Sequence, residues 1–298
     1  MAKEGSGLSG IFNYYRFKSY AYIFIFIFFS FAVINIWYGI LFLILSPILL
    51  IIINLIRADT RKTIFQKEKE ENPILLSGYE KYSGGMFADA ICDYDSALEI
   101  NPNNPSVYLY RSMAKLNMND NDGAIKDATK SIELSDQNIN IRFKGHQIAG
   151  IAKFNLGNFK DAISSFNIAI EISSEDLSRE DELDNSIVYV QRGNCYRELG
   201  EEQKALNDYQ ARISINSYCE EALSGIGIIA SSFFKDDAAA IEYFNKAILS
   251  NSENPFHYLK RGISKQALGD SNGACEDWKK ASELGDVDAA ELLKEHCE

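Results

Sequence analysis

The chain has 298 residues and a formal net charge of −12, and this charge is unevenly distributed. Residues 1–70 carry 8 Lys and Arg against 4 Asp and Glu, whereas the remainder carries 22 against 38. A surface this acidic repels the phosphate backbone, which argues against a nucleic-acid partner and leaves proteins and peptides. The five cysteines form no C-x-x-C pair, and their odd number predicts free thiols in a reducing compartment, most of them buried.

An uncharged, apolar segment of 38 residues lies between Lys18 and Arg57. As one helix rising about 1.5 Å per residue it would be roughly 57 Å long, nearly twice the ~30 Å hydrocarbon core of a bilayer. Residues 35–39 (NIWYG) suit a turn at the membrane interface, so we expect a transmembrane helical hairpin over residues 19–56. A single tilted span and a hairpin within one leaflet are alternatives. A cleaved signal peptide is a further one, but its apolar region would be only ~7–15 residues long.

Basic residues flank this segment on both sides. Arg16 and Lys18 precede it, and Arg57, Arg61 and Lys62 follow it. Positive charge marks cytoplasmic flanks, so both ends of the hairpin are expected on the cytoplasmic side. The sequence therefore predicts an integral membrane protein whose larger, C-terminal part faces the cytoplasm.

A second pattern repeats six times along the rest of the chain. An alanine followed by an apolar residue recurs at spacings of 34, 38, 43, 35 and 34 residues: Ala90, Ala124, Ala162, Ala205, Ala240 and Ala274. An aromatic residue follows four positions later in five of these units: Tyr94, Phe166, Tyr209, Phe244 and Trp278. This arrangement, with a period near 34, resembles the tetratricopeptide repeat (TPR). The resemblance covers residues 71–288 and implies an all-α, right-handed superhelical solenoid of about six helix pairs.

Small residues occupy two further positions of the repeat. One glycine set lies in the first helix, where it lets helices approach closely: Gly78, Gly150, Gly193 and Gly262. A second set lies where the first helix must end, as a left-handed cap: Gly85, Gly157, Gly200 and Gly269. Three units depart from the pattern and are expected to be the least regular. Repeat two has Ala128 at the aromatic position, repeat four has Arg212 at a small-residue position, and repeat five has Ile228 in place of the first-helix glycine.

An arginine precedes an aspartate by sixteen residues in three units: Arg111 and Asp127, Arg192 and Asp208, Arg261 and Asp277. Repeats three and five lack both members, and repeat one has Ser77 opposite Asp93. We interpret each pair as a tie between the two helices of its own repeat, with an architectural role and no catalytic one.

Motifs that would carry chemistry are weak. GIGIIA at 225–230 has the form of a dinucleotide fingerprint but lacks the preceding strand and falls inside an expected helix. The NDNDG and GDSNG turns lack the first and last ligands of a calcium loop. His146, His257 and His296 lie in separate units, where repeat order offers no metal spacing and no Cys–His or Ser–His pairing. We therefore expect no enzyme, no cofactor and no metal.

The resemblance places the partner site in a concave groove lined by the first helices. Its inward positions are Leu75, Tyr79, Tyr82, Leu109, Met113, Gln147, Ile151, Phe154, Asn194, Arg197, Lys260 and Ile263, with Ile229 and Gln266 in the same register. Tyr79 and Tyr82 are the expected anchors, because aromatic residues carry much of interface energy; packing against a juxtamembrane helix is their alternative role. The groove lacks the Lys and Asn set with which some TPR proteins grip a C-terminal carboxylate. The acidic insertion 173–185 is a second candidate surface, or else a solvated loop.

The expected organisation has five parts: an N-terminal cytoplasmic segment (1–18), the hairpin (19–56), a charged linker (57–70), six repeats (71–288) and a C-terminal capping helix (289–298). In the cap, Leu292 and Leu293 are expected to cover the open end of the stack. Cys275 and Cys297 are expected to meet there as two free thiols, with a disulfide between them as the alternative. The sequence predicts a membrane-tethered scaffold that binds protein or peptide partners, with the bilayer contacted through 19–56. The alternative is a self-associating organiser at the membrane.

Overall fold

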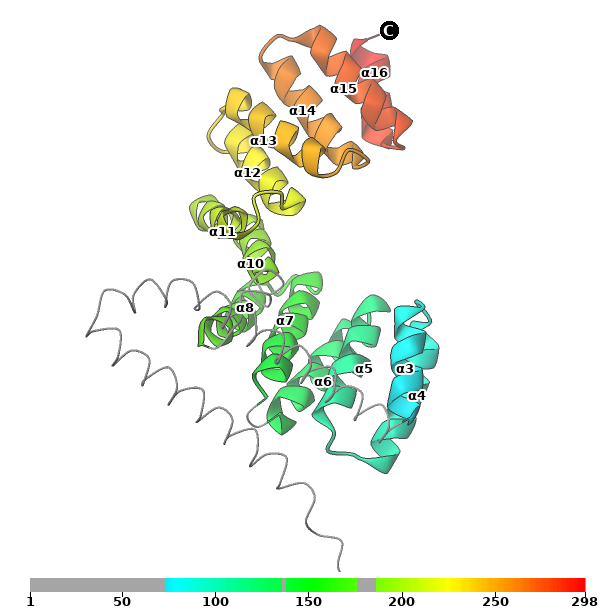
Figure 1. Ribbon diagram of the computed structural model, residues 1–298. Helices are drawn as coiled ribbons and strands as arrows, with labels where there is room; N and C mark the ends of the chain where they lie inside the picture. Colours follow the sequence, from blue (N-terminus) through cyan, green and yellow to red (C-terminus); the bar gives the residue numbers. More distant parts are fainter. Residues whose placement is uncertain (1–72, 136–137, 176–185, 298) are drawn as a thin grey trace, which may run out of the picture. The chain divides into compact units, whose positions relative to one another are not determined.

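The computed structural model describes residues 73–135, 138–175 and 186–297, and these residues contain helices and no strand (Figure 1). The predicted segments 1–18, 19–56 and 57–70 lie outside the described residues, as does most of the acidic insertion. Within the described residues, no helix combines the length and the apolarity that a bilayer crossing requires.

The first seven helices are α3 (Pro73–Ser83), α4 (Phe87–Ile100), α5 (Pro105–Asn117), α6 (Asn121–Leu134), α7 (Ile139–Asn155), α8 (Phe159–Glu175) and α10 (Ile187–Glu198). The other six are α11 (Glu202–Ile215), α12 (Glu220–Ser232), α13 (Asp237–Ser250), α14 (Pro255–Ala267), α15 (Ser271–Glu283) and α16 (Val287–His296).

These helices form six consecutive pairs followed by one single helix. Pairs one to six are α3/α4, α5/α6, α7/α8, α10/α11, α12/α13 and α14/α15, and α16 closes the series (Figure 1). Each second helix contacts the first helix of the next pair, and consecutive first helices also contact one another from α3 through α14. The predicted all-α array of TPR-like helix pairs is confirmed for the described residues.

Local sequence fixes where the helices start and stop. Asp270 is the N-cap of α15, where its side chain accepts a hydrogen bond from the backbone N–H of Gly273 at 2.9 Å, and Asn104 caps α5 in the same manner ahead of Pro105. Gly269, which ends α14, has a φ of 85°, a left-handed conformation that glycine adopts without steric cost. The other three glycines predicted as left-handed caps also have positive φ, which confirms that part of the repeat pattern.

The core of every pair except the second, which has Ala128 at this position, is built around the aromatic residue of its second helix. Tyr94, Phe166, Tyr209, Phe244 and Trp278 are at most 1% exposed. A Cβ atom added at Gly262 would lie 2.6 Å from Trp278 Nε1, and one at Gly150 would lie 2.4 Å from Phe166 Cε1. The first-helix glycines therefore make room for the aromatic rings, as predicted.

The three predicted arginine–aspartate ties are present. Arg111 Nε and Nη2 donate to Asp127 at 2.8 and 2.6 Å, and the corresponding bonds from Arg192 to Asp208 and from Arg261 to Asp277 measure 2.5–2.8 Å. Each guanidinium also lies near the ring of the tyrosine three residues earlier, with 5.3–5.7 Å from Cζ to the ring centroid. The repeated YxxR phrase therefore places a tyrosine beside each arginine that ties a helix pair together.

Each of these arginines makes a third contact that the sequence did not reveal. Its Nη1 donates to the second helix of the preceding pair: Arg111 to Asp95 at 2.5 Å, Arg192 to Asn167 at 2.7 Å and Arg261 to Asn245 at 2.6 Å. We call this three-helix arrangement an arginine clamp. Clamps join pairs one and two, three and four, and five and six.

The junctions between pairs two and three and between pairs four and five carry no arginine clamp. Buried Ala149 takes the arginine position at the first of these junctions, in a cluster with Leu109, Ala128, Ile141 and Ile148. At the second, Tyr209 packs with Cys219, Ala222 and Ile226. Clamped and apolar junctions therefore alternate along the array.

The register predicted for pair five is wrong by one residue. Its inter-helix turn contains one residue more than that of pair six, with Phe233, Phe234 and Lys235 (φ 57°) between α12 and the N-cap Asp236. Gly227, and not Ile228, is consequently the small residue against Phe244, with a Cβ position 3.0 Å from the ring. Ile229, expected in the groove, is only 1% exposed.

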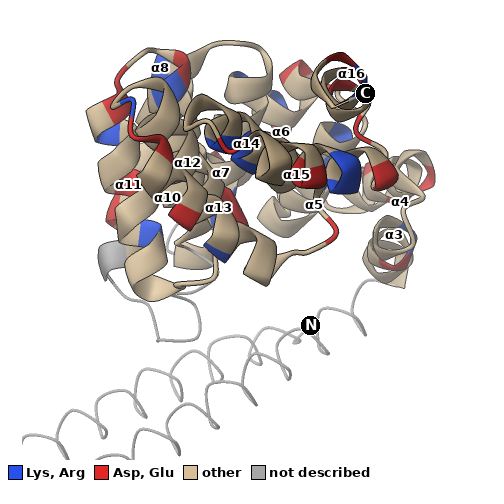
Figure 2. Ribbon diagram, turned by 90° about the horizontal axis from the view of Figure 1, so that it is seen from above, with Lys and Arg blue, Asp and Glu red and all other residues tan. Residues whose placement is uncertain are grey.

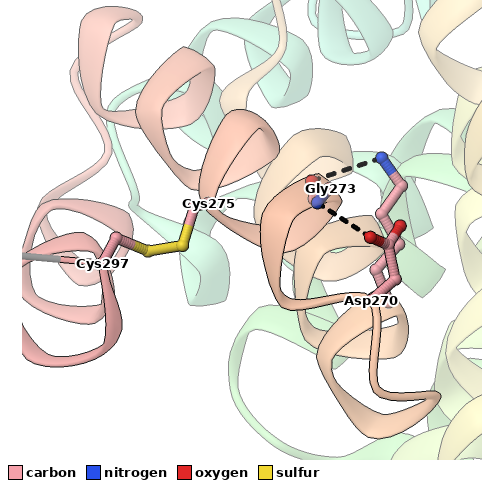
Figure 3. The surroundings of a disulfide bond; sticks show 5 residues. Asp270, Gly273, Cys275 and Cys297 are labelled. Carbon is pink, nitrogen blue, oxygen red and sulfur yellow. Dashed lines mark hydrogen bonds between the residues drawn. A yellow bond between two sulfur atoms is a disulfide. The ribbon is translucent and has the colours of Figure 1, made fainter.

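The cysteine predictions hold in part. Cys195 and Cys219 are buried free thiols, as expected, but Cys92 is exposed. Cys275 and Cys297 meet as predicted, yet they form a disulfide, so the expectation of two free thiols there is wrong (Figure 3). Leu292 and Leu293 pack on the cluster around Trp278, as expected, in a closing helix that spans Val287–His296.

Candidate partner-binding face

The predicted groove residues lie on successive first helices, α3, α5, α7, α10 and α14. We call the ten of them that reach the surface the first-helix face: Tyr79, Tyr82, Met113, Gln147, Ile151, Phe154, Asn194, Arg197, Lys260 and Ile263. Nine are half-buried, and Ile263 is 39% exposed. Because first helices contact one another along the array, these side chains form a run across pairs one to four and a separate group on pair six.

Leu75 and Leu109 do not belong to this face. They are 7% and 4% exposed and lie in the core clusters of pair one and of the junction between pairs two and three. Both lie four residues before a face residue, and on a helix that spacing gives the same side but not the same depth. A partner cannot reach them without repacking of the core.

Aromatic rings concentrate in the N-terminal part of the face. Tyr79 packs edge-on against Tyr110, with 5.7 Å between the ring centroids, and Tyr82 lies 5.4 Å from Phe87. The hydroxyl of Tyr82 accepts a hydrogen bond from Asn117 Nδ2 of the next first helix at 3.2 Å. The two rings are held in place from several sides while one part of each stays exposed to solvent, as suits an anchor for a partner.

The third pair continues the apolar run. Ile151 and Phe154 are half-buried, and the ring of Phe154 lies 5.4 Å from that of Phe159. Asn155 beside them donates to Asn121 Oδ1 of the preceding pair at 3.1 Å. Asn117 and Asn155 occupy the same repeat position, four residues after Met113 and Ile151 respectively. Residues four apart lie on the same side of a helix, so this spacing could have been used to include both asparagines in the predicted site.

Polar groups dominate the rest of the face, and most of them are engaged. Gln147 Nε2 donates to Gln191 Oε1 at 3.2 Å, joining α7 to α10. Asn194 Oδ1 accepts from the buried Tyr209 hydroxyl at 2.6 Å, and the ammonium of Lys260 lies 5.3 Å from the Phe256 ring centroid. These side chains stabilise the array itself, so the apolar half is the better candidate for binding.

A serine, a histidine and a glutamate converge on α12 and α14, contrary to the prediction that no Ser–His pairing would form. His257 Nδ1 lies 3.0 Å from Ser224 Oγ, and its Nε2 lies 2.8 Å from Glu220 Oε1. His257 and Ser224 are 1% and 6% exposed, so a substrate cannot reach the serine oxygen. The order of the repeats in the sequence did not predict this contact, because it depends on the distance between α12 and α14, which is set by how the pairs stack.

Glu220 ties this buried group to the start of α14. It accepts hydrogen bonds from Asn251 at 2.9 Å and from Asn254, the N-cap of α14. Burial raises the pKa of the Glu220 carboxyl, but the hydrogen bonds from Asn254, Asn251 and His257 outweigh burial and hold the pKa below its ordinary value. Ser224, Glu220 and His257 thus form a hydrogen-bonded network that joins pairs five and six.

Charge is mixed over the described helices. Figure 2 shows Lys and Arg segments interspersed with Asp and Glu segments rather than gathered into one basic patch. Many of the basic groups are paired: Lys115 and Lys265 lie 2.7 and 2.9 Å from Asp127 and Asp277. In pair one, which lacks the arginine, Lys81 occupies the same repeat position as these lysines and lies 2.7 Å from Asp93.

Comparison with known proteins shows which repeat and which fold the helix pairs resemble. Residues 187–219 match the tetratricopeptide repeat family model. The solved structure of pilF from Pseudomonas aeruginosa aligns with a TM-score of 0.63 at 13% identity, covering 77% of this chain and 99% of that one, a likeness of fold alone. Residues 187–219 therefore match a tetratricopeptide repeat, and the described helices form a TPR-like array.

Two curated relatives extend the match. Tetratricopeptide repeat protein 16 of Homo sapiens is 25% identical over 207 residues, covering 65% of this chain and 23% of the relative. Dynein axonemal assembly factor 4 of Pongo pygmaeus is 30% identical over 112 residues, covering 36% of this chain and 27% of the relative. The chain thus spans about a quarter of the length of the curated relatives that it matches.

Proposed function

We propose that this protein is a membrane-tethered scaffold that binds protein or peptide partners through the first-helix face and serves the assembly or maintenance of a membrane protein complex. The observation that carries the proposal is the apolar run of Tyr79, Tyr82, Met113, Ile151 and Phe154 on three successive first helices. Arrays of this type generally act as protein-interaction scaffolds. The assembly role is an analogy with the relative dynein axonemal assembly factor 4.

The face suits an extended segment of a partner that carries apolar side chains. Anchored aromatic rings supply contact area at low entropic cost, because their side chains are already held by Tyr110, Phe87 and Phe159. The acidic balance of residues 71–298 favours a partner with basic residues beside its apolar ones.

Crosslinking capture with mass spectrometry tests the binding site. Full-length protein is crosslinked in its native membrane beside a Tyr79→Ala/Tyr82→Ala/Phe154→Ala variant. The matched control removes apolar groups from second helices, Ile100→Ala/Ile168→Ala/Leu249→Ala, at sites that are 39–81% exposed. We expect defined partners with the wild type and the control, and their loss with the first variant. Equal recovery with all three proteins would contradict the proposed site.

The same experiment separates partner binding from self-association. Recovery of only this protein from both the wild type and the first variant would favour the self-associating organiser. Analytical ultracentrifugation of the full chain then distinguishes the two directly, because a scaffold for other proteins stays monodisperse as its concentration rises.

The tether in this proposal is residues 19–56, with the repeats on the cytoplasmic side. It is supported by the 38 uncharged residues and the basic flanks of the sequence. Alkaline carbonate should leave the full chain in the membrane pellet and release a variant that lacks 19–56. Release of the full chain would contradict the tether.

Cys92 provides a test of the orientation. It is an exposed free thiol, whereas Cys195 and Cys219 are buried, and burial raises the pKa of the Cys195 thiol to about 12. A membrane-impermeant maleimide should label Cys92 only after the membrane is permeabilised. Labelling in intact cells would place the repeats outside.

A further inference from the structure

The last helix, α16, is attached to α15 by a covalent bond. Cys275 on α15 and Cys297, the C-cap of α16, form a disulfide with 5.8 Å between their Cα atoms (Figure 3). Their positions are 22 residues apart in sequence, and both residues are half-buried. The bond therefore fixes the far end of α16, and the turn at Gly285 fixes its beginning.

The noncovalent attachment of α16 is slight. The helix has ten residues, of which Ala289 alone is buried, while Leu292 and Leu293 are half-buried and Val287 is 71% exposed. Its backbone lies mainly against α15, and Leu292 and Leu293 also reach the cluster that contains Leu259 of α14. A helix shorter than ~12–15 residues is marginal in water on its own, so α16 depends on whatever holds it to α15.

α16 covers the apolar end of the array. The cluster beneath it contains Trp278, Ala281 and Leu259, of which Trp278 is 1% exposed with its ring centroid 5.7 Å from that of His296. Undocking of α16 would expose one side of this cluster. The change is local, because the arginine clamp between pairs five and six involves Arg261, Asp277 and Asn245 and none of the residues of α16.

We infer that the Cys275–Cys297 disulfide is a redox latch, which holds α16 docked when oxidised and lets it undock when reduced by a dithiol. One thiolate of the reductant attacks a cystine sulfur and the S–S bond breaks, leaving a mixed disulfide and one cysteine thiolate. The second thiol of the reductant then displaces the other cysteine. Two electrons and two protons pass to Cys275 and Cys297, and the reductant leaves as a disulfide.

The other cysteines have no such arrangement. Among the described residues, Cys92 is exposed and Cys195 and Cys219 are buried, and all three are free thiols. Cys275 and Cys297 are thus the pair whose oxidation state changes how a helix is attached. In a reducing compartment the open form is the ground state, and an oxidised dithiol closes it by the reverse of these exchange steps, taking up the two electrons and two protons.

Hydrogen exchange of the full chain, read by mass spectrometry over residues 287–297, tests the latch. The loop-closure relation for a separation of this size predicts that exchange there rises on the order of 100-fold on reduction with a dithiol. A rise of at least about tenfold is the smallest change that we would accept as support for the latch. Exchange in α4 to α8 should stay unchanged, and reoxidation should restore protection. With Trp37→Phe, which leaves Trp278 as the remaining tryptophan, reduction should shift the emission to the red.

Two variants make the result decisive. Cys275→Ser/Cys297→Ser should exchange rapidly over 287–297 under both conditions, with normal protection of α4 to α8 as proof that the array is folded. Cys92→Ser should respond to the reductant as the wild type does. Protection of α16 that survives reduction, or that persists in the double variant, would overturn the latch, as would loss of the response in Cys92→Ser.

Discussion

The two kinds of junction in this array solve the same problem by different means. Between pairs five and six, Arg261 binds Asp277 and Asn245, so directional hydrogen bonds fix the angle between helices. Between pairs four and five, Tyr209 fills the space, and a Cβ atom at Gly225 would lie 2.5 Å from its ring. Apolar packing is non-directional and supplies stability, whereas a paired buried charge supplies geometry at a desolvation cost. We expect the apolar junctions to contribute more free energy and the clamped junctions more positional precision.

The largest effect is expected at an apolar junction. Tyr209→Ala should lower the free energy of unfolding by about 3–5 kcal/mol, because it empties a site that is fully buried against Gly193 and Gly225. Chemical denaturation measures the loss. Tyr218→Ala, at a tyrosine that is 69% exposed, is the matched control and should stay within ~0.5 kcal/mol of the wild type.

A smaller loss is expected from a clamp. Arg261→Gln or Asp277→Asn should each cost about 2–3 kcal/mol, below the full range for buried pairs because the arginine side chain is 18% exposed. The double variant should cost clearly less than the sum of the two, since both changes remove one interaction. Additive losses in denaturation would show that the pair is not coupled and would remove the basis for the comparison.

The clamp can also be transplanted. Ala149 and Ser165 occupy the arginine and aspartate positions of pair three, and Lys153 Nζ already lies 2.9 Å from Ser165 Oγ, as Lys115 lies near Asp127. Ala149→Arg alone should destabilise the array by burying an unpaired charge. Adding Ser165→Asp should recover about 1–2 kcal/mol of that loss. No recovery would mean that the two positions do not define the clamp.

The smallest effect is a dependence on pH at the junction between pairs five and six. The pKa of Glu220 is lowered in the folded state, so its contribution is complete above the unfolded pKa near 4.5 and is lost as pH falls through the folded value. Glu220→Gln should flatten the fall in stability below about pH 4.5. Glu242→Gln, at an exposed site, should leave the wild-type profile unchanged.

The sequence predicted those parts of the fold that depend on position within one repeat. The alanine, the aromatic residue and the first-helix glycine occur at constant offsets because they meet within a single pair, and the sixteen-residue offset of Arg192 and Asp208 is of the same kind. The third contact of each clamp crosses to the preceding pair. The distance between the arginine and its partner in the preceding pair depends on how the pairs stack. Residue spacing within one repeat does not predict that distance.

The errors have equally physical causes. The turn between α12 and α13 contains one residue more than the repeat pattern assumes. The positions predicted for α12 from Ala240, Ile228 and Ile229, are therefore wrong by one residue. The contact of His257 with Ser224 depends on the distance between two first helices, and the bond of Cys275 to Cys297 depends on the angle at Gly285. For the binding face, helical spacing selected ten residues that reach the surface but also included Leu75 and Leu109, which are buried.

The most direct test of the proposed function is site-specific photocrosslinking in the native membrane. A photoreactive amino acid replaces Ile151 on the first-helix face in one protein and Ile168, an exposed second-helix residue, in another. We predict adducts with other proteins from position 151 and none from position 168. Adducts from position 168 alone, or adducts only with further copies of this chain, would contradict the first-helix face as a site for other proteins.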